Sequence, residues 1–200
     1  MPLTYQERPR RTIKESGEER RLYFYEQGEE IPLAAQGVWQ IYRGLVQFST
    51  FYPNGEEILL GWAQPANFFG AWLTSLQTYQ TKALSDVYLR WYSLIEIETS
   101  PRLAQTMLRQ MGGRIRHAET LLAIAGQRKV EDRLNQLLLF LQKEMSEPKE
   151  EGDRLILRLT HQNIANAIGT TRVTVTRLLG DFQRQGKIKL GRDRHIIIKS

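Results

Sequence analysis

The sequence predicts an α+β chain with an antiparallel β-roll, then one long helix, then a winged helix-turn-helix. Three observations lead to this prediction. Short apolar runs broken by turn residues fill residues 21–100, which is typical of an antiparallel sandwich or barrel. Apolar residues at helical spacing follow over residues 101–126. Two helical patterns and a final hairpin pattern occupy residues 127–200, and the charged residues 1–20 are expected to form a flexible arm.

The composition limits the classes of function. With 41% hydrophobic and 25% charged residues, the 200-residue chain resembles ordinary globular proteins. It holds neither a long apolar run nor a signal-peptide core, so we expect a cytoplasmic protein without membrane contact. The absence of cysteine excludes disulfides, thiolate zinc sites and cysteine-ligated iron–sulfur clusters. The three histidines, His117, His161 and His195, are too scattered to predict a metal site, which leaves open only a carboxylate one.

The predicted β-roll is built from alternating or apolar runs such as LYFYE, VWQIYRG and EEILLGWA. Pro53-Asn54-Gly55 predicts a hairpin, because Asn-Gly readily takes the positive φ of tight hairpin turns. The run DVYLRWYSLIEI predicts a further strand that reaches to about residue 98.

The long helix should begin at Ser100 and Pro101, which suit its N-cap and first position. Six apolar residues then alternate at spacings of three and four, as in a coiled coil: Leu108, Met111, Ile115, Ala118, Leu122 and Ala125. This seam predicts a homodimer, with packing against the β-roll as the alternative. After Gly126 a second helix is expected over about 129–145, and the domain boundary near 126–128. A polar loop, SEPKEEGDR, and a short strand, LILRL, should follow.

Residues 160–185 have the spacing of a helix-turn-helix. Thr160 and Thr171 are natural N-caps, and Gly169 can end the first helix in the left-handed conformation. The TRVTVT stretch could be a strand, but a helical period of apolar residues runs through and beyond it: Val175, Leu178, Leu179 and Phe182. The β-branched residues cost only a few tenths of a kcal/mol each in a helix. A basic hairpin over 186–199 then predicts a wing.

The charge distribution points to a polyanionic partner. Residues 159–200 hold eight Lys/Arg against two Asp, and this net charge of +6 equals that of the whole chain. The polar edge of the second helix carries residues suited to reading bases in a major groove: Arg172, Val173 and Arg177. An ordinary solvated helix pair is the alternative. Basic residues of the wing are expected to touch the phosphate backbone: Lys189, Arg192 and Arg194.

On these features the chain resembles the CRP/FNR superfamily of bacterial transcription regulators, whose β-roll is a cyclic-nucleotide-binding-like effector domain. Glycines fall as in that β-roll: Gly28, Gly44, Gly55 and the Phe69-Gly70 pair. The segment GTTRVTVTRLLGDF looks like the recognition segment of the cyanobacterial nitrogen regulator NtcA. The resemblance implies a non-enzymatic homodimer that binds palindromic double-stranded DNA and has RNA polymerase as a partner.

The resemblance also implies roles for single residues. Arg172 and Arg177 match base-reading positions, while Val173 stands where the cAMP-receptor type carries glutamate, which implies a different, GTA-like half-site. The family's DNA-backbone contacts near the helix-turn-helix fall on five residues: Thr160, His161, Gln162, Thr171 and Thr174.

The effector pocket departs from the cAMP pattern. In Phe69-Gly70-Ala71, Ala71 stands where the family carries the acid that holds the ribose of cAMP, and Lys82 stands where it carries the arginine that holds the phosphate, so cAMP is not expected. Trp72, beside the Phe69-Gly70 turn, is a further candidate to fill the pocket. Haem is not expected either, because its usual His or Cys ligands are missing from residues 21–100. Lys82, Arg114 and Glu119 match the positions through which NtcA holds 2-oxoglutarate, so this dicarboxylate is a possible effector. Lysine lacks the bidentate fork of arginine, and ordinary ion pairs of Arg114 and Glu119 remain the alternative reading.

Two other functions compete with an effector-controlled regulator. An effector-free regulator of the same fold would be controlled by its abundance or by a protein partner. A β-roll enzyme with a basic tail is the remote alternative, since such enzymes commonly bind metal through roll histidines and residues 21–100 contain none.

Overall fold

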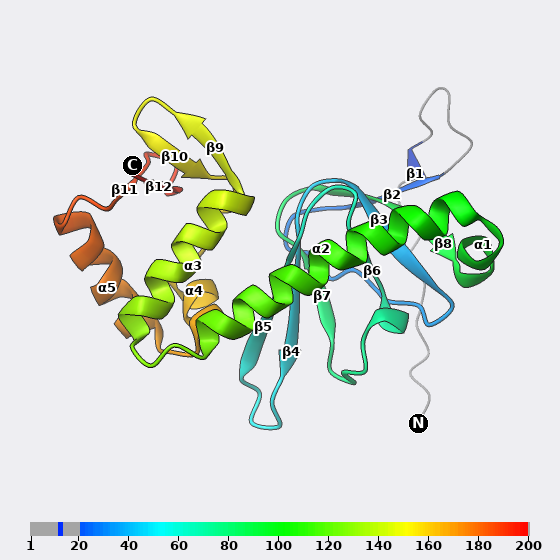
Figure 1. The fold of residues 1–200 in the computed structure, drawn as a ribbon, viewed down its shortest axis with the longest axis horizontal. Helices are drawn as coiled ribbons and strands as arrows, with labels where there is room; N and C mark the ends of the chain where they lie inside the picture. Colours follow the sequence, from blue (N-terminus) through cyan, green and yellow to red (C-terminus); the bar gives the residue numbers. More distant parts are fainter. Residues whose placement is uncertain (1–11, 14–20, 200) are drawn as a thin grey trace. The chain divides into compact units, whose positions relative to one another are not determined.

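The structure, a computed structural model, describes residues 12–13 and 21–199 (Figure 1). The predicted arm over 1–20 lies outside the described residues, apart from the short strand β1 (Thr12–Ile13). The chain forms two compact units. One comprises the chain up to Phe48 together with Trp62–Gly113, and the other comprises Ser49–Gly61 together with the chain from Arg114 onward.

The larger β-sheet is antiparallel and has five strands in the order β1-β2-β8-β3-β6. Its members after β1 are β2 (Leu22–Tyr25), β8 (Val87–Ser93), β3 (Gly37–Arg43) and β6 (Phe68–Phe69). A second sheet has the order β5-β4-β7, formed by β5 (Glu57–Ala63), β4 (Val46–Phe51) and β7 (Gln80–Ala83). Phe48 of β4 packs on Phe69 of β6 with ring centroids 5.6 Å apart, which joins the sheets.

The turn between β4 and β5 confirms the predicted hairpin. Gly55 has φ +82°, and the Tyr52 N–H donates to the Glu56 carbonyl across 2.9 Å. The positive φ explains why glycine stands at this position.

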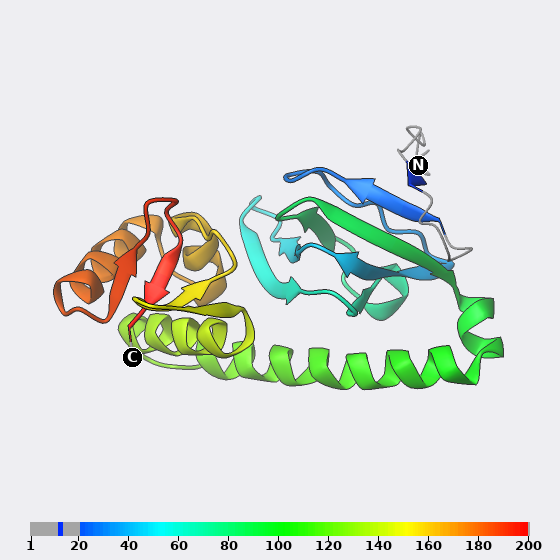
Figure 2. The same ribbon diagram turned by 90° about the horizontal axis from the view of Figure 1, so that it is seen from above.

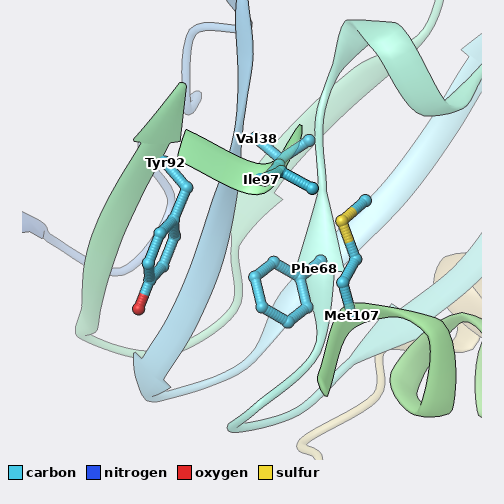
Figure 3. Packing of buried hydrophobic residues seen from close by; sticks show 5 residues of the cluster. All are labelled: Val38, Phe68, Tyr92, Ile97 and Met107. Carbon is cyan, nitrogen blue, oxygen red and sulfur yellow. The ribbon is translucent and has the colours of Figure 1, made fainter. Parts of the chain in front are cut away.

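The core of the first unit brings together side chains from five elements (Figure 3). The helices involved are α1 (Leu94–Thr99) and α2 (Pro101–Ala125), and the short 3-10 helix η1 (Ala71–Leu73) follows β6. The cluster consists of Val38, Phe68, Tyr92, Ile97 and Met107. Burying each large apolar side chain contributes about 1.5–3 kcal/mol, so this cluster holds the start of α2 against the sheet.

Helix α1 corrects the prediction of one continuous strand to about residue 98. Strand β8 ends at Ser93, whose hydroxyl accepts from the Glu96 N–H at 3.2 Å. In return the Glu96 carboxylate accepts from the Ser93 N–H at 2.8 Å. This reciprocal capping box starts a helix within a run whose apolar alternation is typical of a strand.

The second unit carries the C-terminal part of α2 and a four-stranded antiparallel sheet of order β11-β12-β10-β9 (Figure 2). Its helices are α3 (Val130–Glu144), α4 (His161–Ile168) and α5 (Arg172–Arg184). Its strands are β9 (Ser146–Lys149), β10 (Gly152–Leu155), β11 (Ile188–Leu190) and β12 (Ile196–Ile198). The helix ranges, the two-helix turn and the wing hairpin agree with the sequence prediction.

The β9–β10 hairpin corrects a second expectation. SEPKEEGDR is a hairpin rather than a polar loop. The strand predicted at LILRL lies earlier in the chain, because β10 ends at Leu155, the first residue of that run. Strand β10 pairs with β9 on one side and with β12 on the other. Backbone pairing with β12, more than forty residues away, overrides the polar composition of the segment.

Candidate DNA-binding surface

The helix-turn-helix is fixed by caps at the start of each helix and at the end of the first. The Thr160 hydroxyl accepts from the Asn163 N–H at 3.1 Å, and Asn163 Oδ1 accepts from the Thr160 N–H at 3.0 Å. Gly169 ends α4 with φ 59° and ψ 58°. The Thr171 hydroxyl then accepts from the Thr174 N–H at 3.2 Å. These threonines, predicted as backbone contacts, therefore lie at the N-termini of α4 and α5, where the free N–H groups favour anions.

Helix α5 has one buried and one exposed face. Its buried face consists of Val175, Leu178, Leu179 and Phe182, which settles the TRVTVT stretch as helical. Arg172 and Arg177 are exposed, and Val173 is 78% exposed. Exposure of a β-branched apolar residue beside two arginines gives no folding benefit, but it suits contact with a thymine methyl group.

Arg177 is oriented by a neighbour that the sequence prediction missed. Its Nη1 lies 3.3 Å from Asp181 Oδ2, and Asp181 also pairs with Arg184. Exposed pairs of this kind contribute at most about 1 kcal/mol, so the guanidinium can exchange Asp181 for a base edge at little cost. The four-residue spacing of Arg177 and Asp181 was visible in the sequence as a helical ion pair.

The two helices of the motif are also joined at their exposed ends. His161 Nδ1 lies 2.7 Å from the Thr176 hydroxyl, which donates to the Arg172 carbonyl at 2.9 Å. Gln162 bonds to Asn166 on its own helix at 2.7 Å. Arg133 of α3 supports the turn, since its Nη1 donates to the Gly169 carbonyl at 3.4 Å.

The wing places Arg192 and Arg194 at an exposed turn between β11 and β12. Arg194 has φ +65°, and its N–H donates to the Gly191 carbonyl at 2.9 Å. Lys189 lies in a different setting, because its Nζ is 2.7 Å from Glu151 Oε2 at the β9–β10 turn. The hydrogen bond and charge of Lys189 lower the pKa of the Glu151 carboxyl group. Because the two residues are 38 positions apart, the sequence alone did not predict this pair.

The Glu151–Lys189 pair yields a prediction for DNA affinity. Glu151→Gln should strengthen DNA binding about two- to fivefold, because the exposed carboxylate of Glu151 no longer competes with phosphate for Lys189. Glu150→Gln removes the same charge from the same turn and leaves the pair in place, so it serves as the control in fluorescence-anisotropy titrations. Equal strengthening by both variants would instead indicate general charge repulsion.

The predicted effector residues are divided between the two units. Phe69 and Gly70 are buried, and a Cβ on Gly70 would lie 2.9 Å from the Gly37 carbonyl oxygen, so this glycine is required by packing. Ala71, exposed Trp72 and exposed Lys82 belong to the first unit, whereas Arg114 and Glu119 belong to the second. The dicarboxylate pocket therefore stays a prediction.

Helix α2 exposes most of the predicted seam. Leu108, Ile115 and Leu122 are 73%, 56% and 75% exposed, and Ala118 and Ala125 are exposed while Met111 is half-buried. Met107 and Ile124, on the other side of the helix, are buried. The chain's own fold thus covers Met107 and Ile124 but leaves the seam uncovered.

Within the described ranges 12–13 and 21–199, the structure has no cluster of three or more His, Asp or Glu residues suited to a metal ion. In the same part of the chain, none of the helices has the length and apolar content that a membrane span requires.

Comparison with known proteins shows to which family this chain belongs. The chain is 35% identical over 172 residues to the regulatory protein CysR of Synechococcus elongatus, covering 84% of this chain and 79% of CysR. The chain belongs to the CRP/FNR family of transcription regulators. It is also 34% identical over 167 residues to the global nitrogen regulator of Nostoc sp., covering 78% of this chain and 74% of that protein. The family model of the Crp-like helix-turn-helix domain matches residues 132–200.

Solved structures of CRP/FNR proteins share the fold. A CRP-family regulator from Thermus thermophilus superposes with a TM-score of 0.75 at 21% identity, covering 88% of this chain and 91% of that one. FixK2 from Bradyrhizobium japonicum gives a TM-score of 0.74 at 21% identity, with coverages of 90% and 92%. The predicted fold class and family are confirmed, and this CRP/FNR protein is a DNA-binding transcription regulator rather than an enzyme.

Proposed function

We propose that this regulator binds a palindromic DNA site as a homodimer and reads each half-site with Arg172, Val173 and Arg177. The observation that supports this most directly is the division of α5 into a buried apolar face and an exposed edge bearing these three residues. Arginine can donate two hydrogen bonds to guanine O6 and N7, and valine can contact a thymine methyl group. A half-site containing GTA offers both kinds of contact.

The proposed dimer forms along the exposed seam of α2. Three large apolar side chains at heptad-like spacing lie open to solvent on this helix: Leu108, Ile115 and Leu122. Burial of such a seam against its own copy is the geometry of a two-stranded coiled coil. The two α5 helices would then enter successive major grooves about 34 Å apart.

Backbone contacts in this proposal come from two sources. The N-termini of α4 and α5 offer free N–H groups and polar side chains to phosphate oxygens: Thr160, His161, Gln162, Thr171 and Thr174. The wing adds Lys189, Arg192 and Arg194. Because several phosphates are neutralised, affinity should fall steeply as the salt concentration rises.

Selection of bound duplexes from a random pool tests this function. We expect an inverted repeat whose half-sites are one helical turn apart. Enrichment of a single unpaired half-site would argue against the dimer, and no enrichment would argue against sequence-specific reading. Transcription reactions with purified RNA polymerase, the partner we propose in the cytoplasm, would then show the sign of regulation.

We further propose that a dicarboxylate such as 2-oxoglutarate modulates DNA affinity. Similarity to global nitrogen regulators and the cations Lys82 and Arg114 support this choice over cAMP. Calorimetric titration should show binding at millimolar or lower 2-oxoglutarate, and Lys82→Ala should weaken it. No heat and an unchanged operator affinity at millimolar 2-oxoglutarate would leave the effector-free regulator, controlled by abundance or by a protein partner.

A further inference from the structure

The wing turn is held from the side by an arginine of β10. Arg154 Nη2 lies 2.5 Å from Asp193 Oδ2 in the turn, and its Nη1 lies 2.8 Å from Glu147 Oε1 on β9. The Arg154 side chain is only 24% exposed. One guanidinium therefore bridges two carboxylates that are far apart in the sequence, in the fork geometry that arginine provides and lysine does not.

The same turn contains further contacts that depend on this placement. Asp193 Oδ1 accepts from the His195 N–H at 3.2 Å, and His195 Nδ1 lies 2.8 Å from the Leu155 carbonyl oxygen. Between these residues, Arg194 holds a left-handed φ of +65°. A non-glycine residue keeps that conformation only where its surroundings enforce it. The clamp through Asp193 is therefore part of what sets the direction of the turn.

We propose that Arg154 is a positioning residue for DNA binding: it clamps Asp193 so that Arg192 and Arg194 meet the phosphate backbone in one fixed arrangement. This inference rests on the proposed function of the wing. Preorganising the turn removes the ordering cost that a loose turn would incur on binding.

The charges around Arg154 agree with a clamp rather than a direct DNA contact. The Arg154 hydrogen bond lowers the pKa of the Asp193 carboxyl group, which is the direction that a direct ion pair produces. Both terminal nitrogens of Arg154 already face carboxylates. Arg154 thus acts on DNA through the two exposed arginines that flank Asp193.

A double-mutant cycle in the full-length chain tests the proposal. Arg154→Ala should weaken binding to the selected duplex about five- to twentyfold. In an Arg192→Ala/Arg194→Ala background, where no wing-turn cation remains to be positioned, the same change should have less than a twofold effect. Lys149→Ala, which removes a lysine that pairs with Glu147 at 3.4 Å, is the matched control and should leave affinity nearly unchanged.

Two further measurements separate positioning from folding. Arg154→Lys keeps the positive charge but lacks the fork, so it should weaken DNA binding nearly as much as Arg154→Ala does. Urea unfolding measures the stability of each variant. Hydroxyl-radical footprints should lose protection of the backbone beside the wing and keep it over the major-groove half-sites.

An equal loss from Arg154→Ala in both backgrounds would overturn the positioning role. If Arg192→Ala/Arg194→Ala itself leaves affinity and footprint unchanged, the wing's proposed DNA contact fails, and the role of Arg154 fails with it. If the unaltered chain enriches no inverted repeat, the failure lies instead in the proposed function.

Discussion

Replacing Ile115 and Leu122 with glutamate should convert the protein to a monomer and weaken binding to the palindromic site at least about a thousandfold, equivalent to about 4 kcal/mol. Both side chains are exposed in the single chain, so the change removes no contact within its own core. In the seam, however, each substitution would lose an apolar contact worth about 1.5–3 kcal/mol and bury a charge. A monomer then holds one half-site at a time.

Sedimentation equilibrium and duplex titration together measure this effect. Ile95→Glu is the matched control, because Ile95 is 72% exposed on α1 and lies outside the seam. It should leave both mass and affinity unchanged. A dimeric mass for the Ile115→Glu/Leu122→Glu variant would show that subunits associate elsewhere, and the seam would then need another explanation.

Local signals explain why most helices could be predicted. Helix α5 follows from the spacing of Val175, Leu178 and Phe182 and from the Thr171 cap, all of which are close in sequence. Helix α1 was missed although its Ser93–Glu96 capping box is equally local, because the apolar residues around it alternate as in a strand. Periodicity was therefore a weaker guide than capping at this junction.

Contacts between residues far apart in the chain explain why β10 and the clamp on the wing turn could not be predicted from the sequence. Besides its local pairing with β9, strand β10 is held by Asp153 and Arg154, which pair with Ile198 and Ile197, and no residue within SEPKEEGDR predicts that second partner. The clamp on Asp193 could not be predicted for the same reason, because Arg154 is 39 residues away in the sequence. Exposure and charge predicted which arginines face solvent, but the carboxylates that orient them come from other elements of the fold.

Arg177→Ala should relax base preference at one position of each half-site by about 1–3 kcal/mol, or roughly five- to 150-fold. The exposed guanidinium lies on the polar edge of α5, 3.3 Å from its Asp181 partner. Losing a bidentate contact to guanine removes discrimination at that base pair, while phosphate contacts elsewhere continue to supply affinity.

Arg184→Ala gives the decisive comparison, because Arg184 also pairs with Asp181 but lies about two turns further along, at the C-terminal end of α5. Each variant removes one positive charge and one ion pair with Asp181. Titration against duplexes altered at each position of the half-site should show a changed preference only for Arg177→Ala and a uniform, smaller loss for Arg184→Ala. If Arg177→Ala weakens every duplex equally, the residue contacts phosphate, and base reading must be assigned to Arg172 and Val173 alone.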